Sequence, residues 1–432
     1  MKGGTIPHNP SPPSAPLPER EGLGVGRPDR ATDVPACGNR PTPNPSLPGR
    51  GEAGDHPQPR TISLSINTSW NLVNFRSNLI ARLQREGYAV VALSPLDAHS
   101  AALVAMGVRH IPIAIDSKGV SPIRDLLLAL RYRRILKAVR PVAFLGWTIK
   151  PNIYGSLAAH ALGIPVINNI SGLGTAFIKP GLLTRIVQML YRAALARSAT
   201  VFFQNRHDRD LFVTQRLVRE AQTLLLPGSG IDLAQFVPEP FDETRPPVFL
   251  MVARLLRDKG VVEFADAARI VRRTHPDVRF ALLGFLDVQN RTAIDRATVE
   301  GWQREGILHY LGEAADVRPH LARSTAVVLP SYREGMPRSL LEAAAMGRPL
   351  IATDVPGCTE IARAGENAVL CAPRDARSLA DAMLTLLDLD PGARAEMGRC
   401  SREIAEREFD VTVIEERYLA AIEQATDRRP RF

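Results

Sequence analysis

The sequence predicts an α/β fold made of two doubly wound, parallel-sheet domains in tandem. Short β-branched runs alternate with helical stretches from residue 61 onward, and the alternation restarts after a proline-rich linker near residues 238–247. At 432 residues the chain is also too long for one hydrophobic core. We expect one domain at 60–240, a second at 247–408, and a C-terminal helix at 409–427 that crosses back to the first domain.

The expected elements follow this alternation in order. The first domain opens with a strand at 62–66, a helix from about 71 to 86, and a second strand at 89–93. Its further strands are expected at 108–113, 142–145, 165–168, 200–203 and 223–226. The second domain has expected strands at 248–252, 279–283, 308–311, 326–329 and 349–352. Two such domains leave a cleft between the carboxyl edges of their sheets, where ligands of open α/β sheets bind.

The first 59 residues differ from the rest of the chain. They are crowded with proline, glycine and arginine and show scarcely any aliphatic periodicity. Such a segment cannot bury enough apolar surface to fold, so we expect a disordered tail. No run of about 18 apolar residues and no apolar signal segment is present, which predicts a protein that stays in the cytoplasm.

Positive charge is concentrated in the first domain. Residues 60–220 carry a net charge of +14, whereas residues 247–432 carry −2. Two helix-like stretches, 124–140 and 182–197, mix arginine and lysine with leucine and isoleucine. Three interpretations compete: an anionic membrane surface, nucleic acid, and an ordinary solvated face. No nucleic-acid-binding motif accompanies the charge, so we expect no nucleic-acid partner, and a membrane is favoured only if the substrate is a lipid.

Two glutamates bracket a strand-to-helix turn in the second domain. Glu334 follows the buried run 325–329, and Glu342 is expected two turns into the next helix. Both carboxylates could then reach one ligand above the helix N-terminus, whose N–H groups favour an anionic group. A polyhydroxylated ligand with an anionic part fits this pattern. The alternative is a solvated loop acid and a charge on the helix surface.

Two cations follow the first strand of the second domain. Arg254 leaves the strand and Lys259 opens the next helix, at the same expected edge as Glu334. Such cations suit a diphosphate leaving group, whose developing charge must be neutralised. Taken alone, they could equally be surface residues.

The second domain resembles the nucleotide-binding domain of family 4 retaining glycosyltransferases, which have the GT-B fold. The resemblance rests on the cations at 254 and 259, the glutamate pair, and the loop 354–360. The first domain is also similar through residues 226–232 and 236–238, so that coverage runs from about 61 to 425.

The resemblance implies a role for each donor-site residue. Arg254 and Lys259 would hold the donor diphosphate, and Glu342 would hold the ribose hydroxyls. Glu334 would contact the donor sugar, with backbone N–H groups nearby. The implied donor-site residues are Arg254, Lys259, Glu334, Gly335, Met336 and Glu342, of which Arg254, Lys259 and Glu334 would be catalytic.

Loops of the first domain would face the acceptor and its phosphates. The candidates there are Ser69, Asn71, Lys150, Gly172 and Gly174. Many family members carry a histidine near the donor sugar, but the matching stretch 147–150 has none, so no histidine receives a catalytic role. The glycine pair common in the first loop of GT-B enzymes is also missing.

The stretches 148–155 and 168–174 resemble a narrower bacterial group that extends undecaprenyl-diphosphate-linked sugars in O-antigen, capsule or protein-glycan pathways. The resemblance implies a UDP-sugar donor carrying GalNAc or GlcNAc, a lipid-linked glycan acceptor, and a peripheral place on the inner face of the plasma membrane. A UDP-sugar 2-epimerase and a non-catalytic membrane-associated scaffold remain as alternatives.

We expect no cofactor and no metal. The Asp-x-Asp segments 208–210 and 388–390 are better explained by helix ends. No suitably placed carboxylate for double displacement is evident on the acceptor side. The expected route is front-face attack, in which the departing diphosphate helps to deprotonate the acceptor.

Overall fold

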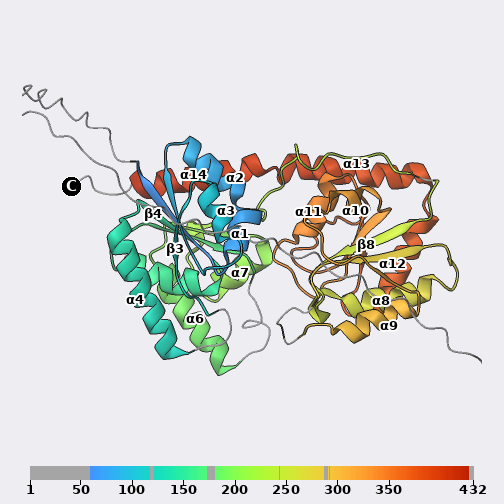
Figure 1. Cartoon of the computed structure of the whole chain (residues 1–432), viewed down its shortest axis with the longest axis horizontal. Helices are drawn as coiled ribbons and strands as arrows, with labels where there is room; N and C mark the ends of the chain where they lie inside the picture. The colour runs from blue at the N-terminus through green and yellow to red at the C-terminus, as the bar shows by residue number, and fades with distance from the viewer. Residues whose placement is uncertain are drawn as a thin grey trace, which may run out of the picture. The chain divides into compact units, whose positions relative to one another are not determined.

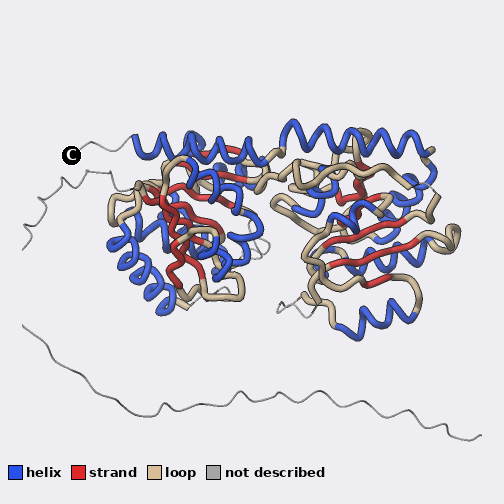
Figure 2. Tube along the Cα trace, turned by 45° about the horizontal axis from the view of Figure 1, so that its top comes forward, coloured by secondary structure: helices blue, strands red, loops and turns tan. Residues whose placement is uncertain are grey.

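The computed structural model describes residues 59–116, 121–172, 181–242, 244–286, 290 and 292–427. The expected tail at 1–59 lies outside these residues, except for Pro59. Two sheets, each with helices on both faces, account for the described chain (Figures 1 and 2).

The first sheet has seven parallel strands in the order β3-β2-β1-β4-β5-β6-β7. Their bounds are β1 (Thr61–Ser65), β2 (Ala89–Ser94), β3 (Arg109–Pro112), β4 (Ala143–Trp147), β5 (Val166–Ile170), β6 (Thr200–Phe203) and β7 (Thr223–Leu225). The central strands β4, β5 and β6 are buried along their whole length, as expected for strands covered by helices on both faces.

The helices of this part of the chain connect the parallel strands. They are α1 (Ser69–Phe75), α2 (Ser77–Arg85), α3 (Ser100–Ala105), α4 (Pro122–Val139), the π-helical turn Pro151–Gly155, α5 (Ser156–His160), α6 (Leu182–Leu195) and α7 (Arg206–Thr214). Side chains cap two of them, since Thr68 accepts the N–H of Asn71 and Asn205 accepts that of Asp208.

The second sheet has six parallel strands in the order β10-β9-β8-β11-β12-β13. They are β8 (Val248–Val252), β9 (Arg279–Leu283), β10 (His309–Tyr310), β11 (Ala326–Leu329), β12 (Leu350–Thr353) and β13 (Ala368–Cys371). The helices are α8 (Val261–Val271), α9 (Arg296–Arg304), α10 (Arg318–Ala322), α11 (Arg338–Ala345), α12 (Ala376–Asp388), α13 (Pro391–Glu408) and α14 (Val411–Asp427).

Strand order locates the switch point of each sheet. In the first sheet the order reverses between β1 and β4, and in the second between β8 and β11. Crevices form at the carboxyl ends of such strand pairs. The loops after β8 and β11 are therefore the places where the second sheet is expected to bind a ligand.

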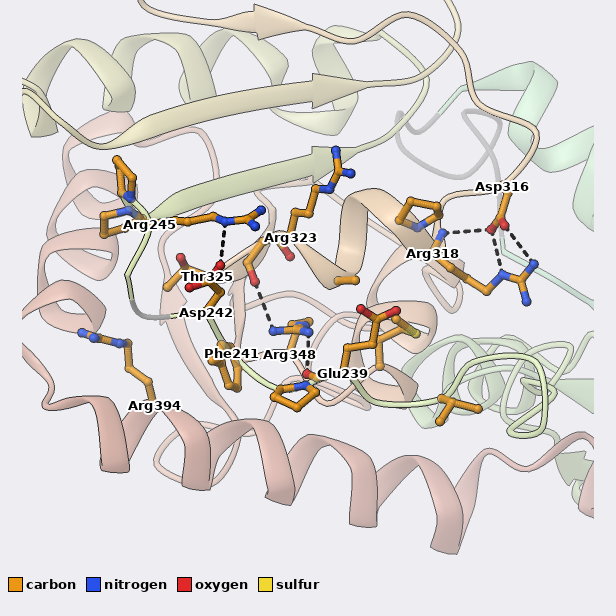
Figure 3. Close-up of a pocket in the computed structure, with 18 of the residues that line it drawn as sticks. Glu239, Phe241, Asp242, Arg245, Asp316, Arg318, Arg323, Thr325, Arg348 and Arg394 are labelled. Atoms are coloured by element: carbon orange, nitrogen blue, oxygen red, sulfur yellow. Dashed lines mark hydrogen bonds and ion pairs between the residues drawn. The ribbon is translucent and has the colours of Figure 1, made fainter.

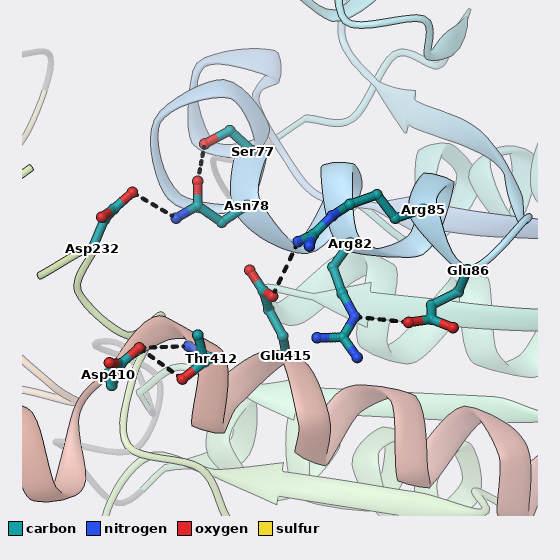
Figure 4. A network of polar contacts seen from close by, with 9 residues as sticks. All are labelled: Ser77, Asn78, Arg82, Arg85, Glu86, Asp232, Asp410, Thr412 and Glu415. Atoms are coloured by element: carbon teal, nitrogen blue, oxygen red, sulfur yellow. Dashed lines mark hydrogen bonds and ion pairs between the residues drawn. The ribbon is translucent and has the colours of Figure 1, made fainter. Parts of the chain in front are cut away.

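The last helix, α14, packs into the core of the first sheet. Ile414 and Ile422 are buried with strand residues of β1 and β4, and the hydroxyl of Tyr418 accepts a hydrogen bond from Trp147 Nε1 at 3.1 Å. An ion pair between Glu415 and Arg85, 3.7 Å long, joins α14 to α2 (Figure 4).

Two sequence expectations were wrong in detail. The helix expected from 71 to 86 is broken into α1 and α2 at Arg76, whose φ of −133° is not helical. Arg76 is buried with its guanidinium 5.3 Å from the ring centre of Trp147, so a tertiary contact decides the break. Strand β13, the short run Ala368–Cys371, was not anticipated.

Candidate active site

A glycine brings the loops after β8 and β11 together. Gly260 has a φ of +76°, and a Cβ placed on it would lie 2.1 Å from the carbonyl oxygen of Pro330. Only glycine tolerates both the conformation and the contact. The 3₁₀ turn Arg257–Lys259 is thereby held against the 331–337 loop that follows β11.

This contact brings two of the three predicted catalytic residues into an ion pair. Lys259 Nζ lies against Glu334 Oε1, and the same oxygen accepts a hydrogen bond from Ser331 Oγ at 2.7 Å. The Glu334 side chain is 10% exposed and that of Lys259 is 21% exposed, so a ligand at the edge can still reach both. The ammonium can neutralise an anion while the carboxylate accepts hydroxyl protons.

Backbone N–H groups of the 331–337 loop lie beside this pair. Within the described residues, neither Gly335 nor Met336 donates its N–H to another group. Gly357, with a φ of +85°, approaches the loop so closely that a Cβ would lie 2.6 Å from the carbonyl oxygens of Glu334 and Gly335. The loop is therefore packed against the segment 354–360, which carries part of the family resemblance.

Arg254 completes the cationic edge. It lies in the loop after β8, and its exposed side chain makes no ion pair or hydrogen bond among the described residues. Its guanidinium is thus available to an anion such as a diphosphate.

Glu342 lies on α11, just over one turn from the start of the helix rather than two turns as expected. Its Oε1 accepts a hydrogen bond from Arg338 Nε at 2.8 Å. Burial raises the pKa of the Glu342 carboxyl, and the neighbouring Arg338 opposes that shift. The second carboxylate oxygen has no partner among the described residues.

The residues predicted on the acceptor side differ in how accessible they are. Ser69 is fully buried, and its hydroxyl lies 2.9 Å from both Ser94 Oγ and the carbonyl of Pro95. We therefore withdraw Ser69 from the acceptor site, because it joins two loops and presents no surface. Asn71 on α1 is half-buried, and its side chain makes no hydrogen bond within the described chain.

Lys150 is held by an ion pair that the sequence did not reveal. Its Nζ lies 2.7 Å from Asp125 Oδ1 on α4, and Tyr154 donates to the other oxygen at 3.0 Å. This cation ties α4 to the end of β4. An acceptor phosphate would have to share it with Asp125.

Of the two glycines predicted on the acceptor side, Gly172 lies within the described residues and Gly174 does not. Gly172 has a φ of +131° and approaches Gly335, since a Cβ on it would lie 3.8 Å from Gly335 Cα.

Thr148 was not singled out as a site residue. It stands directly after β4, in the stretch where the histidine is missing, with a φ of +63°. Left-handed backbone is uncommon for a β-branched residue and is concentrated at functional sites. Its hydroxyl is buried and has no hydrogen-bond partner in the described part of the chain.

The Asp-x-Asp segments form no metal site in the described residues, where no three acidic, histidine or cysteine side chains gather suitably. Asp390 caps α13 by accepting the N–H of Ala393 at 3.0 Å. Asp208, however, does more than begin α7, because its buried carboxylate pairs with Arg333 of the 331–337 loop.

A cavity of about 630 Å³ lies at the other edge of the second sheet (Figure 3). The linker residues Phe241 and Asp242 line it, together with Thr325 and Arg348, which precede β11 and β12. Arg348 is fully buried, donates to the carbonyl of Glu239 at 2.7 Å, and stacks 4.4 Å from the ring centre of Phe241. This cavity holds none of the predicted site residues.

Comparisons with known proteins match both domains of the chain. Residues 61–205 match the family described as "Glycosyl transferase 4-like", and residues 246–389 match "Glycosyl transferases group 1". The chain is 26% identical over 366 residues to N,N'-diacetylbacillosaminyl-diphospho-undecaprenol alpha-1,3-N-acetylgalactosaminyltransferase of Campylobacter jejuni, covering 81% of this chain and 94% of that protein.

Two further similarities extend the picture. An Escherichia coli UDP-Gal:alpha-D-GlcNAc-diphosphoundecaprenol alpha-1,3-galactosyltransferase is 24% identical, covering 63% of this chain and 73% of that protein. The crystal structure of a glycosyltransferase from Rickettsia africae superposes with a TM-score of 0.70 at 16% identity, covering 86% of this chain and all of that one. The chain is therefore a glycosyltransferase with the GT-B fold, built from a glycosyl transferase 4-like domain and a group 1 domain.

Proposed function

We propose that this glycosyltransferase moves an N-acetylhexosamine, GalNAc or GlcNAc, from a UDP-sugar to a polyprenyl-diphosphate-linked glycan with retention of configuration. The observation that carries the proposal is the Lys259–Glu334 pair at the β8–β11 switch point, with the exposed Arg254 in the same loop as Lys259. The names of the Campylobacter and Escherichia coli relatives support the acceptor class, and the latter supports a UDP-sugar donor.

The proposed chemistry follows from the positions of these groups. Arg254 and Lys259 would neutralise the charge that develops on the departing diphosphate, the largest electrostatic change in the reaction. Glu334 would accept hydroxyl protons of the donor sugar, and the second oxygen of Glu342 would accept those of the ribose. The diphosphate oxygen would take the acceptor proton on the same face, so the proposal needs neither a metal nor a cofactor.

A lipid-linked acceptor requires contact with a membrane surface, and α4 and α6 offer a suitable face. Both helices pack against the turn Pro151–Gly155, and they lie on the same face of the first sheet (Figure 1). The exposed apolar side chains on them are Ile123, Leu126, Leu127, Leu130, Ile186 and Met189. The exposed basic side chains on them are Arg124, Arg131, Arg133, Arg134, Lys137, Arg185 and Arg192.

This combination favours an anionic bilayer over a merely solvated face. Four large aliphatic side chains of α4 are 46–75% exposed, and lysine and arginine of the same helix flank them. Apolar insertion plus attraction to anionic headgroups is how interfacial helices bind. Among the described residues, no helix is both long enough and apolar enough to span a membrane.

The first test of the activity is UDP release by the full chain from a panel of UDP-sugars, with and without undecaprenyl-diphosphate-linked acceptor. We expect release that depends on the acceptor and on one UDP-N-acetylhexosamine. Release without any acceptor and with an epimerised product would favour the epimerase instead. No release from any donor by folded protein would refute the proposal.

The membrane part has a separate test, co-sedimentation with vesicles of phosphatidylglycerol and phosphatidylethanolamine. The variant Leu126→Ser/Leu127→Ser should lose most of the binding, whereas Leu96→Ser, an exposed leucine 74% accessible before α3, should keep it. Equal binding by both variants would contradict the assignment of this face.

A further inference from the structure

The 331–337 loop that carries Glu334 is held from two sides. The second domain supports it through Lys259 and Gly357. Residues from the ends of β5 and β6 of the first domain contact it from the other side. Asn205 Nδ2 donates to the carbonyl of Gly335 at 3.1 Å, and a Cβ on Gly335 would lie 2.3 Å from the carbonyl oxygen of Ser171.

The strongest of these contacts is an ion pair. Arg333 Nη2 lies 2.5 Å from Asp208 Oδ1, and the Asp208 side chain is only 2% exposed. Asn205 caps α7 through the N–H of Asp208, so one short segment supplies both contacts to the loop. A charge-assisted hydrogen bond to a buried carboxylate is stronger and more directional than a neutral one.

Because Arg333 and Gly335 flank Glu334 in sequence, contacts to these two residues fix the backbone between them. We propose that Asp208 and Arg333 are positioning residues, which hold Glu334 at the donor sugar only while the 331–337 loop is docked on the first domain. This inference rests on the proposed function and deepens it. It means that the acceptor domain takes part in ordering a residue of the donor site.

The proposal separates turnover from nucleotide binding. The groups assigned to UDP, namely Arg254, Lys259 and Glu342, all belong to the second domain. Loss of the Asp208–Arg333 pair should therefore leave UDP affinity unchanged. Turnover should fall, because misplacement of a reacting group by about 1 Å can cost about 100-fold in rate.

The test uses Asp208→Asn, which keeps the shape of the side chain and removes its charge. Its matched control is Asp210→Asn, a carboxylate on the same helix whose side chain is 65% exposed and pairs with Arg209 at 3.6 Å. Hydrogen exchange of the peptide covering 331–337 should be faster in Asp208→Asn than in the wild type and unchanged in Asp210→Asn. This readout needs no activity.

Kinetics supply the second readout, with rates expressed per folded molecule. We expect kcat to fall about 10- to 100-fold in Asp208→Asn and in Arg333→Gln, with UDP affinity kept within about twofold. The double variant should be no slower than the slower single variant, since the two residues act as one unit.

The outcomes are distinguishable. Unchanged exchange at 331–337 in Asp208→Asn would overturn the proposal, as would a kcat per folded molecule equal to that of the wild type. Equal effects of Asp210→Asn would overturn it too. If the wild type itself releases no UDP from any donor, the proposed function fails, while the exchange measurement still decides whether the pair orders the loop.

Discussion

The two edges of the second sheet both carry charged side chains, but they use them in opposite ways. At the carboxyl edge, Lys259 and Glu334 come from separate loops and pair with each other, and Arg254 stays exposed. At the amino edge, Arg348 is fully buried between backbone carbonyls and the ring of Phe241. The cavity of about 630 Å³ lies at the amino edge, whereas the predicted site residues lie at the other edge.

The two edges therefore differ in how accessible their charged groups are. Charges at the carboxyl edge remain within reach of a ligand, whereas the charge of Arg348 is used to hold the linker. Substitutions at the first edge should therefore change turnover more than stability, and those at the second edge the reverse. Four experiments test this contrast.

The largest expected effect is on turnover at the carboxyl edge. Glu334→Ala should lower kcat about 100- to 1,000-fold, because it removes an acceptor preorganised for the donor sugar. Its melting temperature should change far less, and UDP release with saturating donor measures the rate. Glu366→Ala, an exposed carboxylate before β13, is the control. Near-normal transfer by Glu334→Ala would contradict the site assignment.

The cations should show a related but smaller effect. Arg254→Ala and Lys259→Ala should each lower kcat/KM about 100-fold and weaken UDP binding, which calorimetry can measure. The exposed Arg279, at the amino end of β9, gives the matched variant Arg279→Ala. If Arg279→Ala weakened UDP binding as much as Arg254→Ala, the two edges would not differ as we infer.

At the amino edge the expected effect is on stability. Arg348→Met leaves the carbonyl groups of Glu239 and Ser324 without their donor, which should cost about 1 to 3 kcal/mol of unfolding free energy. Urea unfolding measures it, and kcat per folded molecule should stay unchanged.

The control for that variant is Arg323→Met. Arg323 lines the same cavity but is exposed, and its side chain makes no ion pair or hydrogen bond to another described residue. Its substitution should change stability by less than about 0.5 kcal/mol. Equal losses in the two variants would show that the burial of Arg348 is not what matters.

The sequence predicted the sheet rhythm and the edge at which the donor-site residues meet, because strand ends follow from hydrophobic runs and parallel strands share an edge. It could not predict partners chosen by tertiary structure. Lys150 pairs with Asp125, 25 positions away, and Asp208 pairs with Arg333, 125 positions away. Asp208 was assigned to a helix end for that reason. The short apolar run at β13, by contrast, could have been predicted as a strand from the sequence.

The smallest expected effect concerns Glu342, the buried charge at the carboxyl edge. Its counterpart at the amino edge is Arg348, whose guanidinium pKa is lowered by burial to about 10. Burial raises the pKa of Glu342, so between its ordinary pKa and the raised value the folded protein binds more protons than the unfolded chain. Unfolding free energy should therefore fall as pH rises through that window, by at most about 1.4 kcal/mol per pH unit.

Glu342→Gln should remove this part of the pH dependence, whereas Glu416→Gln, on an exposed position of α14, should keep it. Urea unfolding between pH 4.5 and 7 compares the three proteins, and identical slopes in all of them would contradict the assigned shift. The free-energy cost of burying the Glu342 carboxylate grows toward neutral pH. If Glu342→Gln also loses UDP affinity, the carboxylate serves to bind UDP. Arg348→Met should show no such loss, since its charge serves the linker alone.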